Sequence, residues 1–98
     1  MTYRAIWNGS VVAEASDEAV KRVEGNIYFP PEAVNREFLE HSPSRTQCYW
    51  KGTASYFHVA DGDAVARDAA FSYAKPWPLA RKIRDYVSFW RGVKVEHV

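Results

Sequence analysis

Two segments of this 98-residue chain hold the side chains best suited to chemistry. The first, residues 24–30, carries Glu24 within a run of apolar and aromatic residues, and the second, residues 42–56, carries Lys51 among aromatic ones. An unpaired charge is very costly to bury, so each group must reach solvent, a cavity or a counter-charge. We therefore expect Glu24 and Lys51 to face a common cavity, where one accepts and the other donates hydrogen bonds to a polar ligand.

Aromatic residues make up 15% of the chain, and several with a polar tip lie in or near these segments. Such rings cannot all find hydrogen-bonding partners in a small dry core, whereas they suit the wall of a small-molecule pocket. The alternative for any single ring is a place in the hydrophobic core. With the neighbouring thiol, the predicted ligand-binding set is Glu24, Tyr28, Cys48, Trp50, Lys51, Tyr56 and Tyr73.

Other chemistry at these residues has less support in the sequence. Glu24 and Lys51 could instead form a structural ion pair, and a Schiff-base role for Lys51 would need strong desolvation. Cys48 as a nucleophile would need a base and a thiolate-favouring environment, and no histidine has a motif relation to it. One cysteine and three scattered histidines offer no tetrahedral ligand set, so the sequence predicts no metal site and no cofactor.

Composition excludes several classes of protein. The 13 basic and 12 acidic side chains give a net charge of +1, which is too small to attract nucleic acid or anionic membrane non-specifically. No apolar run approaches the roughly 20 residues of a membrane span, and no apolar stretch follows the first residues as in a signal peptide. We expect a single domain over residues 1–98, in the cytoplasm and with no membrane partner; a homodimer stays open.

Short strands joined by turns must position the predicted site. The Asn8-Gly9 pair, which accepts positive φ at both residues, predicts a hairpin between strands at residues 4–7 and 11–13. Residues 20–29 read as one extended stretch with Glu24 inside it, and Pro30-Pro31 ends it. A short helix is predicted over residues 31–39, followed by aromatic-rich strands at residues 47–50 and 55–59.

The second half of the chain continues this pattern. Asp61-Gly62-Asp63 predicts a turn before a strand at residues 65–73, and two prolines break the chain before a short basic helix at residues 79–85. Strands at residues 86–90 and 93–96 follow. With six or seven short strands, two short helices and no βαβ rhythm, the sequence predicts a mostly β domain with antiparallel pairing.

The pattern Cys-x-Trp-Lys-Gly-x-Ala-x-Tyr at residues 48–56 is distinctive, and further features accompany it nearly end to end, among them Trp7-Asn8-Gly9 and Glu24 with Tyr28-Phe29-Pro30. With these features the chain resembles the bacterial family catalogued as domain of unknown function 427. The resemblance implies a compact all-β domain of β-tent architecture, similar to Mss4-like folds and to the thalidomide-binding domain of cereblon. Several of those relatives hold zinc on two Cys-x-x-Cys pairs, which a chain with one cysteine cannot supply.

Members of that family are sometimes labelled nucleotidyltransferases. Gly9-Ser10 and Asp61-Gly62-Asp63 resemble the glycine-serine and paired-aspartate signature of those enzymes. The two segments lie about fifty residues apart and both read as hairpin turns, so we expect no shared cradle for two metal ions.

We therefore expect a module that binds a small polar or aromatic ligand between the rings and the two charges. One alternative is an enzyme of unknown reaction, with Glu24 as acid or base and Lys51 as an electrostatic stabiliser. Another is a protein or RNA interaction module that uses exposed aromatic residues and the basic residues of positions 81–91. A closed cavity favours the first two, and an open aromatic face favours the third.

Overall fold

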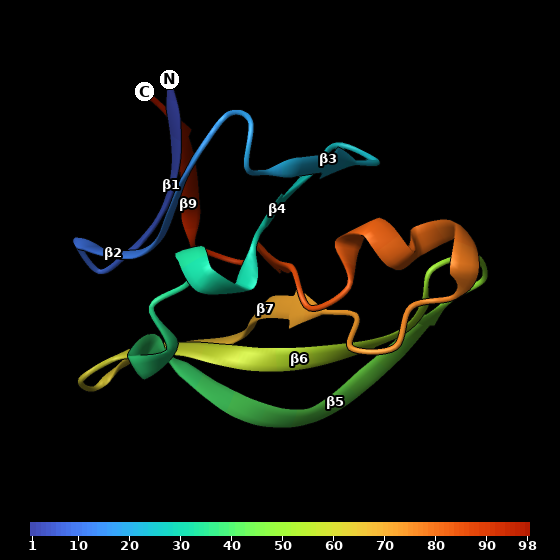
Figure 1. Cartoon of the computed structure of the whole chain (residues 1–98). Coiled ribbons are helices and arrows are strands. Elements are labelled where there is room, and N and C mark those ends of the chain that lie inside the picture. The colour runs from blue at the N-terminus through green and yellow to red at the C-terminus, as the bar shows by residue number, and fades with distance from the viewer.

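The predicted N-terminal hairpin is confirmed in the computed structural model, which describes residues 1–98. Strand β1 (Thr2–Trp7) pairs with β2 (Ser10–Ser16) through a turn in which Asn8 and Gly9 have φ of 53° and 80°. The last strand, β9 (Lys94–His97), pairs with the other edge of β1. This three-stranded sheet brings the two chain termini side by side (Figure 1).

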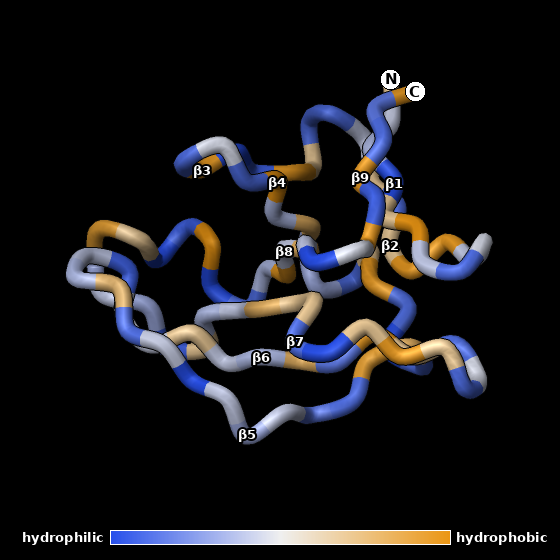
Figure 2. The backbone as a smooth tube through the Cα atoms, turned by 180° about the vertical axis from the view of Figure 1, so that it is seen from behind, coloured by the Kyte–Doolittle hydropathy of each residue, from blue (hydrophilic) through white to orange (hydrophobic).

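The remaining strands form a second, six-stranded antiparallel sheet. In spatial order they are β3 (Lys21–Val23), β4 (Asn26–Phe29), β8 (Val87–Phe89), β7 (Ala64–Ser72), β6 (Gly52–Asp61) and β5 (Leu39–Cys48). The long strand β5 curves along one edge of the sheet and is mostly hydrophilic (Figure 2). A polar edge strand discourages pairing with other chains. The mostly β, antiparallel class predicted from the sequence is confirmed.

The structure differs from the sequence prediction in the segment that precedes Pro30. The predicted extended stretch over residues 20–29 is wrong: the chain reverses within it, so β3 and β4 form a hairpin. Glu24 and Gly25 make the turn, with φ of 53° and 81°. Left-handed backbone of this kind is what a tight hairpin turn requires, and the glycine supplies it at no steric cost. Glu24 therefore lies at the tip of a hairpin and not inside a strand.

The predicted helix over residues 31–39 is also wrong. Two single 3-10 turns, η1 (Pro31–Ala33) and η2 (Arg36–Phe38), stand there, and the next residue already begins β5. Between them the backbone N–H of Asn35 donates to the carbonyl of Val12 at 2.8 Å, and Val34 forms a bridge with Ala13. Pairing with β2 thus overrides the weak local helical pattern. The second predicted helix is likewise a 3-10 segment, η3 (Pro78–Ile83). The chain has nine strands and three 3-10 segments in place of the six or seven strands and two helices predicted.

Two apolar clusters fill the interior. One lies between the two sheets and includes Val12, Phe29, Val59 and Val87. Half of the members of the other are aromatic, and the full set is Val23, Tyr28, Ala54, Tyr56, Phe71, Tyr73, Ala80 and Ile83. Tyr28 and Phe29 are adjacent on β4 but enter different clusters, because successive side chains of a strand point to opposite faces. We call the second set the aromatic cluster. No helix has the length and apolar character needed to cross a bilayer.

Candidate functional site

The Lys51 ammonium lies at the margin of the aromatic cluster. Its side chain is 6% exposed, and its nitrogen is 2.7 Å from Glu24 Oε1 and 3.3 Å from the hydroxyl of Tyr28. The rings of Tyr28, Trp50 and Tyr73 surround it, with centroids 5.8, 5.7 and 5.4 Å away. Cation–π attraction to these faces adds to the ion pair. An ammonium carries three N–H groups, and only two protein oxygens contact this one.

Two turns from distant parts of the chain create this arrangement. Glu24 is at the tip of the β3–β4 hairpin, and Lys51 ends the turn between β5 and β6. A hydrogen bond from a distant segment holds the main chain at Lys51, because the Lys51 carbonyl accepts from the N–H of Trp77 at 3.1 Å. Gly52 has a φ of 107°, and a Cβ there would meet the backbone of residues 75–77 at 3.5–3.6 Å. The turn therefore aims Lys51 into the cluster, where a regular strand would have placed it on the opposite face from Trp50.

The carboxylate of Glu24 closes this site from the solvent side. One oxygen contacts the ammonium, and the other accepts a hydrogen bond from the Trp50 indole N–H at 3.1 Å. Half of the Glu24 side chain (51%) stays exposed. Two adjacent residues, Trp50 and Lys51, thus hold one carboxylate between them.

Electrostatics fix the charge states of this pair. Contacts with Lys51 and then Trp50 hold the pKa of Glu24 below its ordinary value. Burial would lower the pKa of Lys51, but the contacts with Glu24 and Tyr28 outweigh it and raise that pKa above its usual range. Burial also raises the pKa of the Tyr28 and Tyr73 hydroxyls. Lys51 is therefore held as an ammonium, the opposite of what a nucleophilic lysine needs.

The predicted site residues divide into two groups. Glu24, Tyr28, Trp50, Lys51 and Tyr73 gather around the ammonium, as the contacts above show. Tyr56 belongs to the same cluster, yet its hydroxyl pairs with Thr46 Oγ1 at 2.9 Å and its ring lies 5.8 Å from that of Phe71. Cys48 is a free, half-buried thiol packed against the cluster.

Cavities occur elsewhere on the surface. The structure has two, of about 210 Å³ and about 300 Å³. Tyr56 lines the first, and neither is lined by Glu24 or Lys51. We expected Glu24 and Lys51 to face a common cavity; in the structure they instead form a direct ion pair, and neither lines a cavity.

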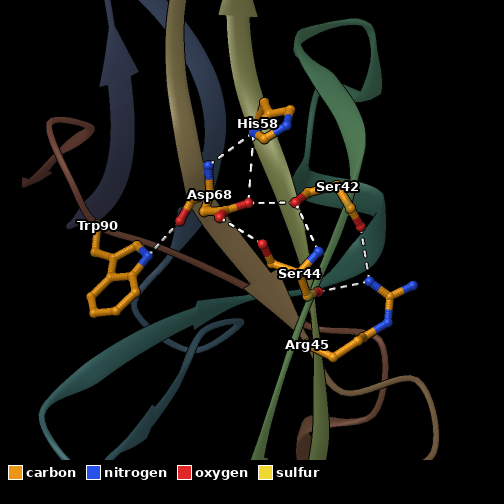
Figure 3. A network of polar contacts seen from close by, with 6 residues as sticks. All are labelled: Ser42, Ser44, Arg45, His58, Asp68 and Trp90. Carbon is orange, nitrogen blue, oxygen red and sulfur yellow. Dashed lines mark hydrogen bonds and ion pairs between the residues drawn. The ribbon is translucent and has the colours of Figure 1, made fainter.

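A polar network around Asp68 was not anticipated from the sequence (Figure 3). Asp68 has a φ of 51° where β7 bulges away from β6. Its carboxylate accepts hydrogen bonds from the hydroxyls of Ser42 and Ser44, which hold its pKa below the ordinary value. Its backbone N–H donates to His58 Nδ1 at 3.0 Å, and its carbonyl accepts from the Trp90 indole at 2.8 Å. The only sequence signal is one acid in an alanine-rich strand.

This network contains serine, histidine and aspartate, but its connectivity is not that of a nucleophile triad. In such a triad the serine hydroxyl donates to histidine, which is oriented by the acid. Here the serine hydroxyls donate to Asp68, and His58 Nδ1 accepts from a backbone N–H. The arrangement fastens β5, through its bulge between His41 and Arg45, to the bulge of β7.

The turns that resemble a nucleotidyltransferase signature lie side by side, although about fifty residues separate them in the sequence. Asp61 accepts hydrogen bonds from the Ser10 hydroxyl at 2.8 Å and from the Asn8 amide at 3.2 Å. Sequence separation was a poor guide here, because packing of the two sheets brings the β1–β2 and β6–β7 turns together. No group of three or more histidine, cysteine, aspartate or glutamate side chains is placed to hold a metal ion.

Comparison with known proteins agrees with the resemblance seen in the sequence. The family model described as Domain of unknown function (DUF427) matches residues 1–98, the whole length of the chain. No curated protein matches the chain.

Proposed function

The chain belongs to the DUF427 family, and from the geometry of the Lys51 site we propose that this domain binds a small molecule that carries a carboxylate group, and that the ligand's carboxylate contacts Lys51. The observation that carries the proposal is the unequal burial of the ion pair. The Lys51 side chain is 6% exposed, whereas the Glu24 side chain that neutralises it is 51% exposed. The carboxylate of Glu24 thus marks a position where water, or a solute, can reach a buried cation.

In this proposal Glu24 is an internal occupant of the site. A ligand carboxylate that replaces it would accept from the Lys51 ammonium and from the Trp50 indole N–H, the two donors that now hold Glu24. Lys51 would remain paired throughout the exchange, which avoids the large cost of leaving a buried charge uncompensated. Glu24 is already half exposed, so its displacement into solvent would cost little free energy.

One aromatic ring extends the site beyond the charges. Trp50 is half-buried and would supply apolar area for the body of a polar or aromatic ligand, while the ammonium fixes its orientation. Tyr28 and Tyr73 are 0% and 5% exposed and form the closed wall behind the ammonium. The N–H of Lys51 that contacts no protein oxygen is a further donor for such a ligand.

The test begins with native mass spectrometry of freshly purified protein, to identify any co-purifying molecule. Acetate, propionate and benzoate are then titrated while the indole N–H signal of Trp50 is followed by NMR. Glu24→Gln removes the internal competitor, so we expect tighter binding of each carboxylate than in the wild type. Lys51→Met should abolish the response, and Lys82→Met, at an exposed lysine, serves as the matched control.

A purely structural ion pair would give a different result. If no carboxylate moves the Trp50 signal in folded wild-type or Glu24→Gln protein, and nothing co-purifies, the proposal fails. It also fails if folded Lys51→Met protein binds as the wild type does. The enzyme alternative has less support, since it uses Glu24 as acid or base and the lowered pKa of Glu24 lies further from neutral pH than that of an ordinary carboxyl.

An interaction module remains the second candidate because some apolar side chains are exposed. Tyr49 and Leu79 are 88% and 83% exposed, and Arg81 and Lys82 lie beside Leu79 in the chain. Binding of a protein or RNA partner that is lost in Tyr49→Ser and Leu79→Ser variants, with the Lys51 site unchanged, would favour this candidate.

A further inference from the structure

A groove on the solvent-facing side of β6 is separate from the Lys51 site. The two cavities share Ser55 and Ala74 in their walls, so they adjoin. Arg36 and Arg45 line the first, and Trp77 lines the second. The groove therefore has guanidinium groups at one end and an indole at the other.

Strand register explains the polar floor of this groove. Arg45 on β5 lies opposite Ser55 on β6, which lies opposite Ser72 on β7. Residues opposite one another in a sheet share a face, and neighbouring strands are about 4.8 Å apart, so this row spans about 10 Å. Thr53, two residues before Ser55, lines the second cavity on the same face.

The guanidinium of Arg45 is oriented by the main chain. Its Nη1 donates to the carbonyls of Ser42 and Ser44 at 2.8 and 2.7 Å. Nε and Nη2 have no protein acceptor and lie on the side away from the Asp68 network (Figure 3). This free edge is the one that binds a carboxylate or phosphate with two parallel hydrogen bonds. Arg36, at the same end of the groove, is exposed and has no protein partner.

The opposite end offers a ring with an unused donor. The indole N–H groups of Trp7, Trp50 and Trp90 each donate to a protein oxygen. Trp77 makes no such bond, and 42% of its surface is exposed. A partly exposed tryptophan whose indole N–H has no protein partner is suited to stacking on a flat group.

The charges of the groove favour an anion. Arg36, Arg45 and Lys75 are its cations, and Asp85 is its one carboxylate. His41 also lines it, with its ring 5.2 Å from that of Phe57. We infer that this groove binds a small organic oxyanion, a carboxylate or a phosphate monoester, held by the two arginines while its flat ring stacks on Trp77. The inference goes beyond the proposed function, because it concerns different residues.

The probes separate the two parts of this inference and the two sources of the oxyanion. Phenyl phosphate and 3-phenylpropionate carry both a ring and a charge, inorganic phosphate lacks the ring, and 3-phenylpropionamide lacks the charge. Each is titrated into ¹⁵N-labelled protein while the Trp77 indole N–H is followed by NMR. We expect the ring-bearing anions to bind about tenfold or more tightly than the other two probes. Whichever of phenyl phosphate and 3-phenylpropionate binds more tightly identifies the oxyanion as a phosphate or a carboxylate.

Variants test the residues. Arg36→Gln breaks no hydrogen bond or ion pair within the protein, so it should keep the fold while weakening the binding of the anions about tenfold. Arg67→Gln, at an exposed arginine on β7 outside both cavities, should leave affinity unchanged. Binding in this groove is followed at the Trp77 indole and binding at the Lys51 site at the Trp50 indole, which separates the two sites. The inference is overturned if the Trp77 signal does not move, if the amide binds as tightly as the anions, or if Arg36→Gln and Arg67→Gln behave alike.

Discussion

The Lys51 ammonium is buried, whereas the Glu24 carboxylate that contacts it at 2.7 Å is half exposed to solvent. The two members of this ion pair are therefore not equivalent. A carboxylate released from the pair can be hydrated where it stands, but a released ammonium remains among Tyr28, Trp50 and Tyr73. Removal of each partner should accordingly have a different consequence.

We expect Glu24→Gln to destabilise the fold more than Lys51→Met does, because only the former leaves a buried charge without a counter-charge. For Lys51→Met, which keeps the apolar stem of the side chain, the loss should be roughly 1–3 kcal/mol. The double variant should recover much of the loss of Glu24→Gln. Urea unfolding of the four proteins checks this, and equal destabilisation by the two single variants would contradict it.

The free energy of unfolding should decrease at acidic pH. The folded-state pKa values of Glu24 and Asp68 both lie below their ordinary values. Groups of this kind contribute stability that is fully present above the unfolded-state pKa, about 4, and is lost as pH falls through the folded-state pKa. Unfolding measured from pH 7 to pH 2 should show this decline. In the Glu24→Gln, Asp68→Asn double variant the decline should be shallower, whereas an unchanged slope would rule out these two groups as its source.

The Asp68 network should stabilise the junction of β5 and β7. Ser42 is 4% exposed and donates to a charged acceptor, so Ser42→Ala should cost about 1.5–3 kcal/mol. Ser44→Ala should cost less because that residue is only half buried. Ser16→Ala, at an exposed serine with no side-chain hydrogen bond, is the control. Thermal and urea unfolding give the comparison, and a Ser42→Ala variant as stable as the control would argue against the network.

Gly52 should tolerate substitution poorly. Its φ of 107° lies outside the conformations that other residues readily adopt, and backbone atoms of residues 75–77 flank the position. We expect Gly52→Ala to cost roughly 1–3 kcal/mol and to shift the indole signal of Trp50. Gly62→Ala, at a φ of 60° in an open turn, should cost about 1 kcal/mol. If the two variants are equally stable, the turn does not depend on glycine at residue 52.

Hairpins and class were predictable from local sequence. Asn8-Gly9 and Asp61-Gly62-Asp63 make turns where predicted, and short β-prone runs between turn signals indicated an antiparallel β domain. Local patterns failed where long-range pairing decided the conformation. Residues 31–39 have the proline and spacing of a helix, but the bonds from Asn35 to β2 hold them in single turns.

The residue types alone determined that Glu24 and Lys51 needed partners, because neither a buried carboxylate nor a buried ammonium is stable by itself. Only the tertiary structure decided that they would be each other's partner. The position of Glu24 depends on the β3–β4 hairpin turn, and that of Lys51 on the β5–β6 turn. The contact between them therefore depends on how the curvature of the sheet brings these two turns together. The same holds for Ser10 with Asp61 and for Ser42 with Asp68. Local sequence fixes turns and faces, whereas contacts between distant segments depend on strand order and bulges, which a single sequence does not encode in any short pattern.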